Sequence, residues 1–307
     1  MIGRALLGLC LLLLAACEGA QGEQAPVEGR FIERGPFAVE GLSDQQLTIW
    51  LPPGYDNAER SYPVLYMHDG HNLFDPAVAN FNKVWAVDQA VLELVEAGAI
   101  EPHIIIGIWA PGENRYRQYL PAFAAEMATG EVAEDIASNA GGPIISARYL
   151  EWLADELKPE IDAEFRTRSD PANTAIIGSS MGGIMSCWAI TERPDIYGRA
   201  GCVSSHWPIT LPEVAEANRE QVVTIWTDYF IENLGEPSGR RIWMDHGTAT
   251  LDEFYPPYQR EIDQAFLAAG WEEGRDFRSE QYDGAEHEEN AWADRLPEIL
   301  AWLLAPE

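Results

Sequence analysis

The stretch TAIIGSSMGGIMSCWAI, residues 174–190, decides the fold. Its first four residues form a short apolar run that is typical of a buried parallel strand. A Gly- and Ser-rich turn follows (GSSMGG, 178–183), and the apolar segment 184–190 then predicts a buried helix. This order of strand, tight turn and helix is the context in which a G-x-S-x-G motif marks a nucleophilic serine.

The central serine of the motif is Ser180, with Gly178 and Gly182 two residues to either side. Glycine is needed at both positions because the turn brings backbone segments so close together that a Cβ would clash. We therefore predict that Ser180 is a nucleophile at the carboxyl end of the sheet. The backbone N–H of Met181, at the helix start, is a predicted hydrogen-bond donor to an oxyanion.

Strand-like and helix-like segments alternate on both sides of this motif. Such alternation predicts an α/β fold with a mostly parallel central sheet and helices on both faces, opened by an antiparallel pair of strands. The predicted strands are 30–39, 46–51, 62–68, 103–108, 174–177, 200–204, 241–245 and 277–282. The predicted helices are 84–97, 147–165, 184–190, a segment within 211–234, one around 258–266, and 290–304.

Length and charge limit what the chain can be. With 307 residues, 47% of them apolar, it can bury a large core, and we expect residues 29–307 to form one catalytic domain. The formal net charge of −30 excludes nucleic acid and an anionic membrane face as probable partners, because both need a basic surface.

The amino-terminal segment predicts export. A basic start and an apolar run ending in small residues make 1–16 a signal peptide, too short to span a membrane. The sequence LAAC, 14–17, resembles the bacterial lipobox, so Cys17 is the predicted lipidation site and 17–28 a flexible tether. We therefore expect a bacterial cell-envelope lipoprotein, periplasmic or surface-facing, tethered to a membrane through Cys17; plain secretion with later cleavage is the alternative.

Cysteine usage points to no metal or cofactor. Beyond the signal, Cys187 and Cys202 fall in predicted buried elements, where two free thiols are the simpler interpretation and a disulfide the alternative. No CxxC or HExxH spacing is present. Asp69, His71 and Asp75 share one short loop and have the right types for a metal site, but a hydrogen-bonded turn explains them as well.

A serine nucleophile needs a histidine as general base, in a loop late in the chain. His287 lies between the last predicted strand and the closing helix, which is where that base is expected. His246 also follows a late strand, whereas His206 follows the strand next to the motif. We predict His287 as the base.

The histidine in turn needs a carboxylate to orient it. The loop after the strand 241–245 offers Asp252, which we favour, with Asp245 second and Glu253 third. Any of them could instead cap the following helix. A second oxyanion donor is expected from the loop after the strand 62–68, from the backbone N–H of Gly70, His71 or Asn72.

Several segments together resemble one family, the esterases of the α/β-hydrolase superfamily that include esterase D, feruloyl esterase modules and enterobactin-type siderophore esterases. The resemblance covers about 47–304. The matching segments are HDGHNLFD (68–75), GENRYRQYLP (112–121), GGPI with YLEWLADELKP (141–159), IIGSSMGG (176–183) and EHEENAW (286–292).

This resemblance implies the α/β-hydrolase fold, with Ser180 as nucleophile and His287 as base. It also favours Asp252, because the acid in similar proteins sits in a G-T-x-x-D-like loop, although this loop carries an extra Ala-Thr-Leu. Some relatives manage with serine and histidine alone.

These observations predict a serine carboxylic-ester hydrolase that acts through an acyl-enzyme on a small-molecule or saccharide ester, without a cofactor. An acyltransferase that passes the same acyl group to a sugar or alcohol is the alternative. A catalytically inactive binding module is disfavoured because Ser180, His287 and acidic candidates are all present. Candidate aromatic walls for a substrate pocket are Trp85, Trp109, Tyr116, Trp207 and Trp226.

Overall fold

An eight-stranded β-sheet runs through residues 28–306, the part of the chain that this computed structural model describes. Its order is β1-β2-β4-β3-β5-β6-β7-β8; β2 pairs antiparallel with β1 and β4, and the other pairs are parallel. The strands are β1 Arg30–Phe37, β2 Gln45–Leu51, β3 Val64–His68, β4 Ile104–Ile108, β5 Thr174–Ser179, β6 Arg199–Val203, β7 Arg241–Gly247 and β8 Phe277–Tyr282.

This arrangement confirms the predicted α/β class, the mostly parallel sheet and the antiparallel opening pair. Each predicted strand is present, with ends that differ by a few residues. The predicted signal peptide, Cys17 and nearly all of the predicted tether lie outside the described residues. Within 28–306, no helix is both long and apolar enough to cross a membrane.

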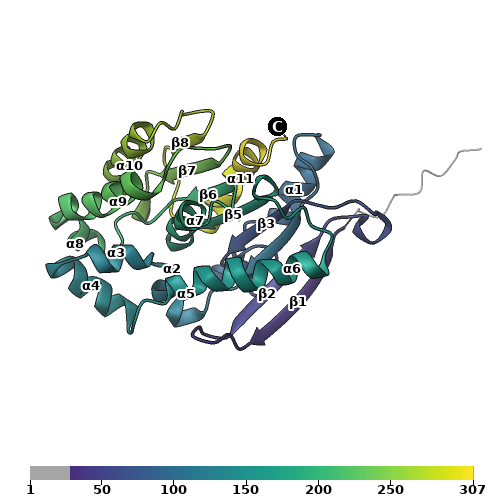
Figure 1. The fold of residues 1–307 in the computed structure, drawn as a ribbon, viewed down its shortest axis with the longest axis horizontal. Coiled ribbons are helices and arrows are strands. Elements are labelled where there is room, and N and C mark those ends of the chain that lie inside the picture. Colours follow the sequence, from purple (N-terminus) through teal and green to yellow (C-terminus); the bar gives the residue numbers. More distant parts are fainter. Residues whose placement is uncertain (1–27, 307) are drawn as a thin grey trace, which may run out of the picture.

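Helices cover both faces of the sheet, and each face has its own apolar core. On one face, α1 Val87–Glu96 and α11 Glu289–Leu303 lie side by side over β3, β5 and β7 (Figure 1). The other face carries the larger core. The helices that contribute to it include α5 Ser146–Glu151 with α6 Lys158–Glu164, α7 Met181–Glu192, α9 Arg219–Asn233 and α10 Pro256–Ala268.

The sequence patterns missed a group of short helices between β4 and α5. These are α2 Arg115–Tyr119, α3 Ala122–Met127 and α4 Gly130–Ala140, and a further short helix, α8 Pro212–Ala217, precedes α9. Helices of about one to three turns leave too few residues for a clear 3.6-residue apolar period. The predicted long helix 147–165 is present as one continuous run, with a π-helical segment, Trp152–Leu157, between α5 and α6.

The turn between β5 and α7 is tight, as predicted, and its backbone is strained. Ser180 occupies it with φ 56° and ψ −120°, a conformation that is costly for any residue with a side chain. A Cβ on Gly178 would lie 2.6 Å from the carbonyl carbon of Gly182, so the two glycines permit a close backbone approach. Strained backbone of this kind clusters at functional sites.

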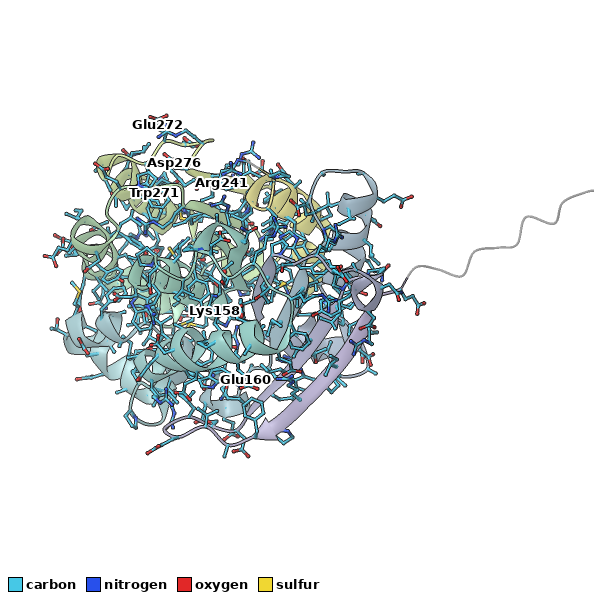
Figure 2. All side chains as sticks on the ribbon, turned by 45° about the vertical axis from the view of Figure 1, so that its right-hand side comes forward. Lys158, Glu160, Arg241, Trp271, Glu272 and Asp276 are labelled. Carbon is cyan, nitrogen blue, oxygen red and sulfur yellow. The ribbon has the colours of Figure 1, made fainter. Side chains whose placement is uncertain are left out.

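At the amino ends of the parallel strands, away from Ser180, the visible contacts are structural. Figure 2 labels Arg241, at the amino end of β7, near Trp271 and Asp276 from the connection that leads into β8. Asp276 accepts a hydrogen bond from the backbone of Glu272 (3.0 Å) and a salt bridge from Arg275 (2.8 Å). Because Ser180 follows the carboxyl end of β5, this amino edge lies away from it.

We expect Gly178→Ala to lower the free energy of unfolding by about 3 kcal/mol, because its Cβ would press on rigid backbone. Gly201→Ala is a matched control on the neighbouring strand β6, where the three atoms nearest to a Cβ belong to the side chain of Ile177, which can move; its expected loss is about 1 kcal/mol. Urea unfolding of both variants measures the difference. Equal losses would show that the approach of Gly178 to Gly182 is not the tight contact described.

Candidate active site

Ser180 follows the last residue of β5 and precedes the first residue of α7, where the strained turn lifts it towards solvent. It is half-buried and lines a pocket of about 480 Å³ together with His287. The structure therefore brings these two predicted residues, 107 positions apart in the chain, to one cavity.

The His287 ring is paired with a buried carboxylate. Its Nδ1 lies 2.5 Å from Oδ1 of Asp252, which is fully buried. The second carboxylate oxygen, Oδ2, accepts hydrogen bonds from the Ser204 hydroxyl (2.6 Å) and the Gly247 N–H (2.6 Å). Burial alone would raise the pKa of Asp252, but the hydrogen bonds and charge of His287, with the bonds from Ser204 and Gly247, lower it below its ordinary value. Asp252 is therefore ionised at neutral pH.

Neighbouring groups fix the orientation of His287. Its backbone N–H donates to the Thr250 hydroxyl at 2.8 Å. Its ring lies edge-to-face with Trp292 (centroids 5.1 Å apart) and with Tyr255 (5.7 Å). Because Nδ1 is bound to Asp252, the other ring nitrogen, Nε2, is the one available to groups in the pocket that His287 and Ser180 both line.

The other candidates from the sequence have different partners. Asp245 is fully buried and accepts from Arg295 (2.7 Å), from the Trp243 indole (2.7 Å) and from the backbone of Ser204 (3.0 Å). Glu253 is exposed. His246 Nδ1 lies 2.6 Å from the carbonyl of Gly247. Of the three candidate carboxylates, Asp252 is the one in contact with His287.

Tyr255 and His206 are site residues that the sequence did not reveal. The Tyr255 ring packs against that of His287, and its hydroxyl lies 2.8 Å from Nδ1 of His206. The backbone N–H of His206 donates to the carbonyl of Ser180 at 3.1 Å. Burial raises the pKa of Tyr255 well above its usual range and is the main cause that lowers the pKa of His206 to about 3, so both groups are neutral near pH 7. No local motif links a tyrosine before a helix to a histidine 49 positions earlier.

The loop after β3 lies beside Ser180 and offers backbone N–H groups. A Cβ on Gly70 would lie 2.5 Å from the carbonyl carbon of Gly107, so only glycine lets the loop approach β4 this closely. The N–H of Asn72 donates to the carbonyl of Asp69 at 2.8 Å. Of the three predicted donors in this loop, Gly70 and His71 therefore remain, alongside Met181 at the start of α7.

An ion pair between buried Asp69 and partly exposed Arg115 anchors the same loop. Asp69, with φ 56°, accepts two hydrogen bonds of 2.7 Å from Arg115 on α2. Burial alone would raise the pKa of Asp69, but the charge and hydrogen bonds of Arg115 lower it. Asp75 accepts from the backbone of Ala77 at 2.8 Å, as expected of a turn. Among residues 28–306, no group of three or more His, Cys, Asp or Glu side chains has metal-binding geometry.

The pocket has charged groups at its wall, and none of the five predicted aromatic walls lines it, so that prediction is wrong. Trp85, Trp207 and Trp226 are buried in the two cores, whereas Trp109 lines a neighbouring cavity and Tyr116 bonds to the backbone of Ile209. Phe81, 87% exposed, and Trp292 line the pocket instead. The charged groups around it are Lys83, Arg115, Asp69, Glu288 and Glu289.

The two cysteines are free thiols. Cys187 on α7 and Cys202 on β6 are both buried, which confirms the simpler of the two interpretations of their spacing. Neither lines the pocket around Ser180.

The sequence matches the family described as "Putative esterase" over residues 43–303. The uncharacterized protein YbbA of Bacillus subtilis is 28% identical over 175 residues, which are 57% of this chain and 62% of YbbA. An endo-1,4-beta-xylanase/feruloyl esterase of Xylanibacter ruminicola is 27% identical over 164 residues, 52% of this chain and 19% of that protein. The chain thus spans less than two thirds of these curated relatives.

Solved structures with similar folds include two esterases and a serine hydrolase. A ferulic acid esterase superposes with a TM-score of 0.64 at 20% identity, covering 90% of this chain and 98% of that one. An IroE-like serine hydrolase from Shewanella oneidensis gives 0.65 at 17% identity, covering 88% and 79%. The enterobactin esterase FES from Shigella flexneri gives 0.56 at 16% identity, covering 91% and 60%. These likenesses confirm the predicted α/β-hydrolase fold.

We expect Arg115→Met to lower the free energy of unfolding at pH 7 by about 2 kcal/mol, because it leaves the Asp69 carboxylate buried without a cation. The pKa of Asp69 is depressed in the folded protein, so its stabilising contribution is present at neutral pH and is lost as pH falls below about 4. The gap between variant and wild type should therefore narrow at low pH.

Urea unfolding at pH 7 and pH 3 measures this gap. Arg117→Met, on the same helix, is the control, because Arg117 makes no ion pair with any residue that the structure describes. A gap of the same size at both pH values would contradict the role given to the Asp69–Arg115 pair.

Proposed function

Since the chain belongs to the Putative esterase family, we propose that it is a serine carboxylic-ester hydrolase with Ser180, His287 and Asp252 as its catalytic triad. The observation that supports this most is the 2.5 Å contact between His287 Nδ1 and Asp252, on a ring that faces the pocket of Ser180. Nucleophile, base and orienting acid are the three roles that acyl transfer requires.

The proposed reaction begins with attack of the Ser180 hydroxyl oxygen on the ester carbonyl. His287 Nε2 takes the serine proton and returns it to the leaving alcohol, while Asp252 stabilises the imidazolium that forms. The negative oxygen is stabilised by the N–H of Met181 together with that of Gly70 or His71. Water then attacks the acyl-enzyme by the same route and releases the acid.

A hydrogen bond from Ser180 to His287 is part of this proposal. Both side chains line the same pocket, and the serine hydroxyl carries the proton that is transferred. Attack requires this proton to turn towards His287, and catalytic hydrogen bonds are often completed only when substrate is bound. Tyr255 keeps its own proton, because its pKa is raised by burial, and its partner His206 stays in place.

We propose small-molecule or saccharide esters as the substrate class. Ferulic acid esterases and an enterobactin esterase are among the structures that this chain resembles. Hydroxyl-rich substrates suit a pocket lined by charged groups such as Lys83 and Glu289, and the exposed ring of Phe81 offers an apolar surface. A panel of feruloylated, acetylated and siderophore esters would identify the group that is accepted.

The triad predicts the effect of three substitutions on hydrolysis of p-nitrophenyl acetate. Ser180→Ala and His287→Ala should each lower kcat by about 10⁴-fold or more, and Asp252→Asn by about 10³- to 10⁴-fold. Glu253→Gln is the control, since this exposed carboxylate of the same segment should leave kcat within about twofold. Hydrolysis that survives Ser180→Ala would refute the proposal, and acyl transfer to added sugar in place of acid release would favour the transferase.

We also propose that the mature protein is a lipoprotein of the bacterial cell envelope, joined to lipid through Cys17. The support is the LAAC sequence at 14–17 after an apolar run. Cells fed radioactive palmitate should yield a labelled protein, and Cys17→Ala should abolish the label. Label retained by that variant would rule out lipidation at this position.

A further inference from the structure

Ser204 lies behind the triad, out of reach of the substrate pocket, and is fully buried. It follows the last residue of β6, and its φ of 40° is unusual for a residue with a side chain. A residue held in such a conformation needs support from its surroundings. Ser204 makes four hydrogen bonds, one through its backbone N–H and three through its hydroxyl.

The direction of each bond follows from the groups involved. The Ser204 hydroxyl accepts from the Trp292 indole N–H (3.0 Å) and from Nη2 of Arg295 (2.6 Å), which can only donate. Its single proton therefore has to point to Oδ2 of Asp252, 2.6 Å away, which as a carboxylate can only accept. A hydroxyl polarised by two donors is itself a stronger donor.

Arg295 and Asp245 form a buried ion pair beneath this hydroxyl. Nη2 of Arg295 reaches Oδ1 of Asp245 at 2.7 Å, and the two side chains are 3% and 0% exposed. Nε and Nη1 of Arg295 have no hydrogen-bond partner among the residues that the structure describes. Replacing a buried ion pair by packed apolar residues often leaves the free energy of unfolding unchanged or raises it. Stability alone therefore does not account for the Arg295–Asp245 pair.

We propose that Ser204 is a positioning residue for the Asp252–His287 pair, held in place by Arg295 and Trp292. The inference rests on the proposed hydrolase function. By donating to Oδ2, Ser204 keeps Asp252 ionised and turns its other oxygen to Nδ1 of His287. The charge of Arg295 acts on the triad through this hydroxyl, while Asp245 balances that charge.

Ser204→Ala tests the proposal by removing the proton that Asp252 receives. We expect kcat/KM for p-nitrophenyl acetate to fall about 10- to 100-fold through kcat, with KM little changed, because Ser204 touches no substrate. The pKa of Asp252 should rise once this donor is lost. The acidic limb of the pH profile, which belongs to the Asp252–His287 pair, should therefore move to higher pH by about one unit.

Two further variants separate the hydroxyl from the backbone. Ser204→Gly also lacks the hydroxyl but suits the positive φ, so it should lose the same activity even if Ser204→Ala folds poorly. Ser205→Ala is the matched control, because the adjacent Ser205 hydroxyl is equally buried and has no hydrogen-bond partner among residues 28–306. It should keep both the wild-type kcat/KM and the wild-type pH profile.

A double variant shows whether Ser204 acts through Asp252. In an Asp252→Asn background, Ser204→Ala should cause no further loss of kcat/KM. A full additional loss in that background, or wild-type activity and pH profile in both Ser204→Ala and Ser204→Gly, would overturn the proposal.

A measurement without substrate keeps this test separate from the proposed function. Carboxyl ¹³C NMR of aspartate-labelled protein, with the Asp252 signal assigned by its absence in Asp252→Asn, follows the protonation of that group directly. In Ser204→Ala the midpoint of Asp252 should move to higher pH, even in a Ser180→Ala background that cannot turn over an ester. An unchanged midpoint would refute the inference, whereas absent Ser180-dependent hydrolysis would refute the hydrolase alone.

Discussion

The carboxylate of Asp252 places a strict demand on the fold, since it is fully buried and carries a charge. An unpaired buried charge costs several kcal/mol, so the fold has to bring donors to it from separate loops. They come from Ser204 after β6, from Gly247 at the end of β7 and from His287 after β8. Satisfying one group thus fixes three adjacent strand ends relative to one another.

The geometry at Gly247 shows how tightly this demand is met. Its N–H lies 2.6 Å from Oδ2 of Asp252, and a Cβ at this position would come within 2.1 Å of the carbonyl oxygen of Ala285. That carbonyl belongs to the loop that leads to His287, and it accepts the N–H groups of Thr248 and Ala249. The loops after β7 and β8 are therefore joined by backbone hydrogen bonds. These bonds keep Asp252 close to His287.

Much of this could be predicted from sequence because each part has a local cause. The strand, the Gly-flanked Ser180 and the helix are contiguous, and a strand–turn–helix pattern is visible in seventeen residues. His287 could be found because its loop sits between two clear elements. Asp252 was favoured but not separated from Asp245, because one lies in β7 and the other in the turn that follows it, and only three-dimensional contacts distinguish them.

The rest depends on contacts between distant segments, which one sequence does not display. Tyr255 meets His206 across 49 positions and the ring of His287 across 32. Of the three residues inserted before Asp252, relative to the resembling family, Thr250 and Leu251 open a short 3-10 turn, Thr250–Phe254, and Ala249 directly precedes it. That turn supplies the Thr250 hydroxyl, which accepts a hydrogen bond from the backbone N–H of His287. The inserted residues therefore contribute to the site.

The closing helix α11 links the packing of the whole domain to the triad. It begins two residues after His287, and Trp292 and Arg295, three positions apart, lie on one face of it. Both donate to Ser204, while Leu296, Ile299 and Leu300 of the same helix fill the core beneath β5 and β7. These apolar residues fix the position of α11 on the sheet. That position places Trp292 and Arg295 so that they orient the Ser204 hydroxyl towards Asp252. Burial of this amphipathic helix thus also aligns Asp252 with His287, 35 residues apart in the chain.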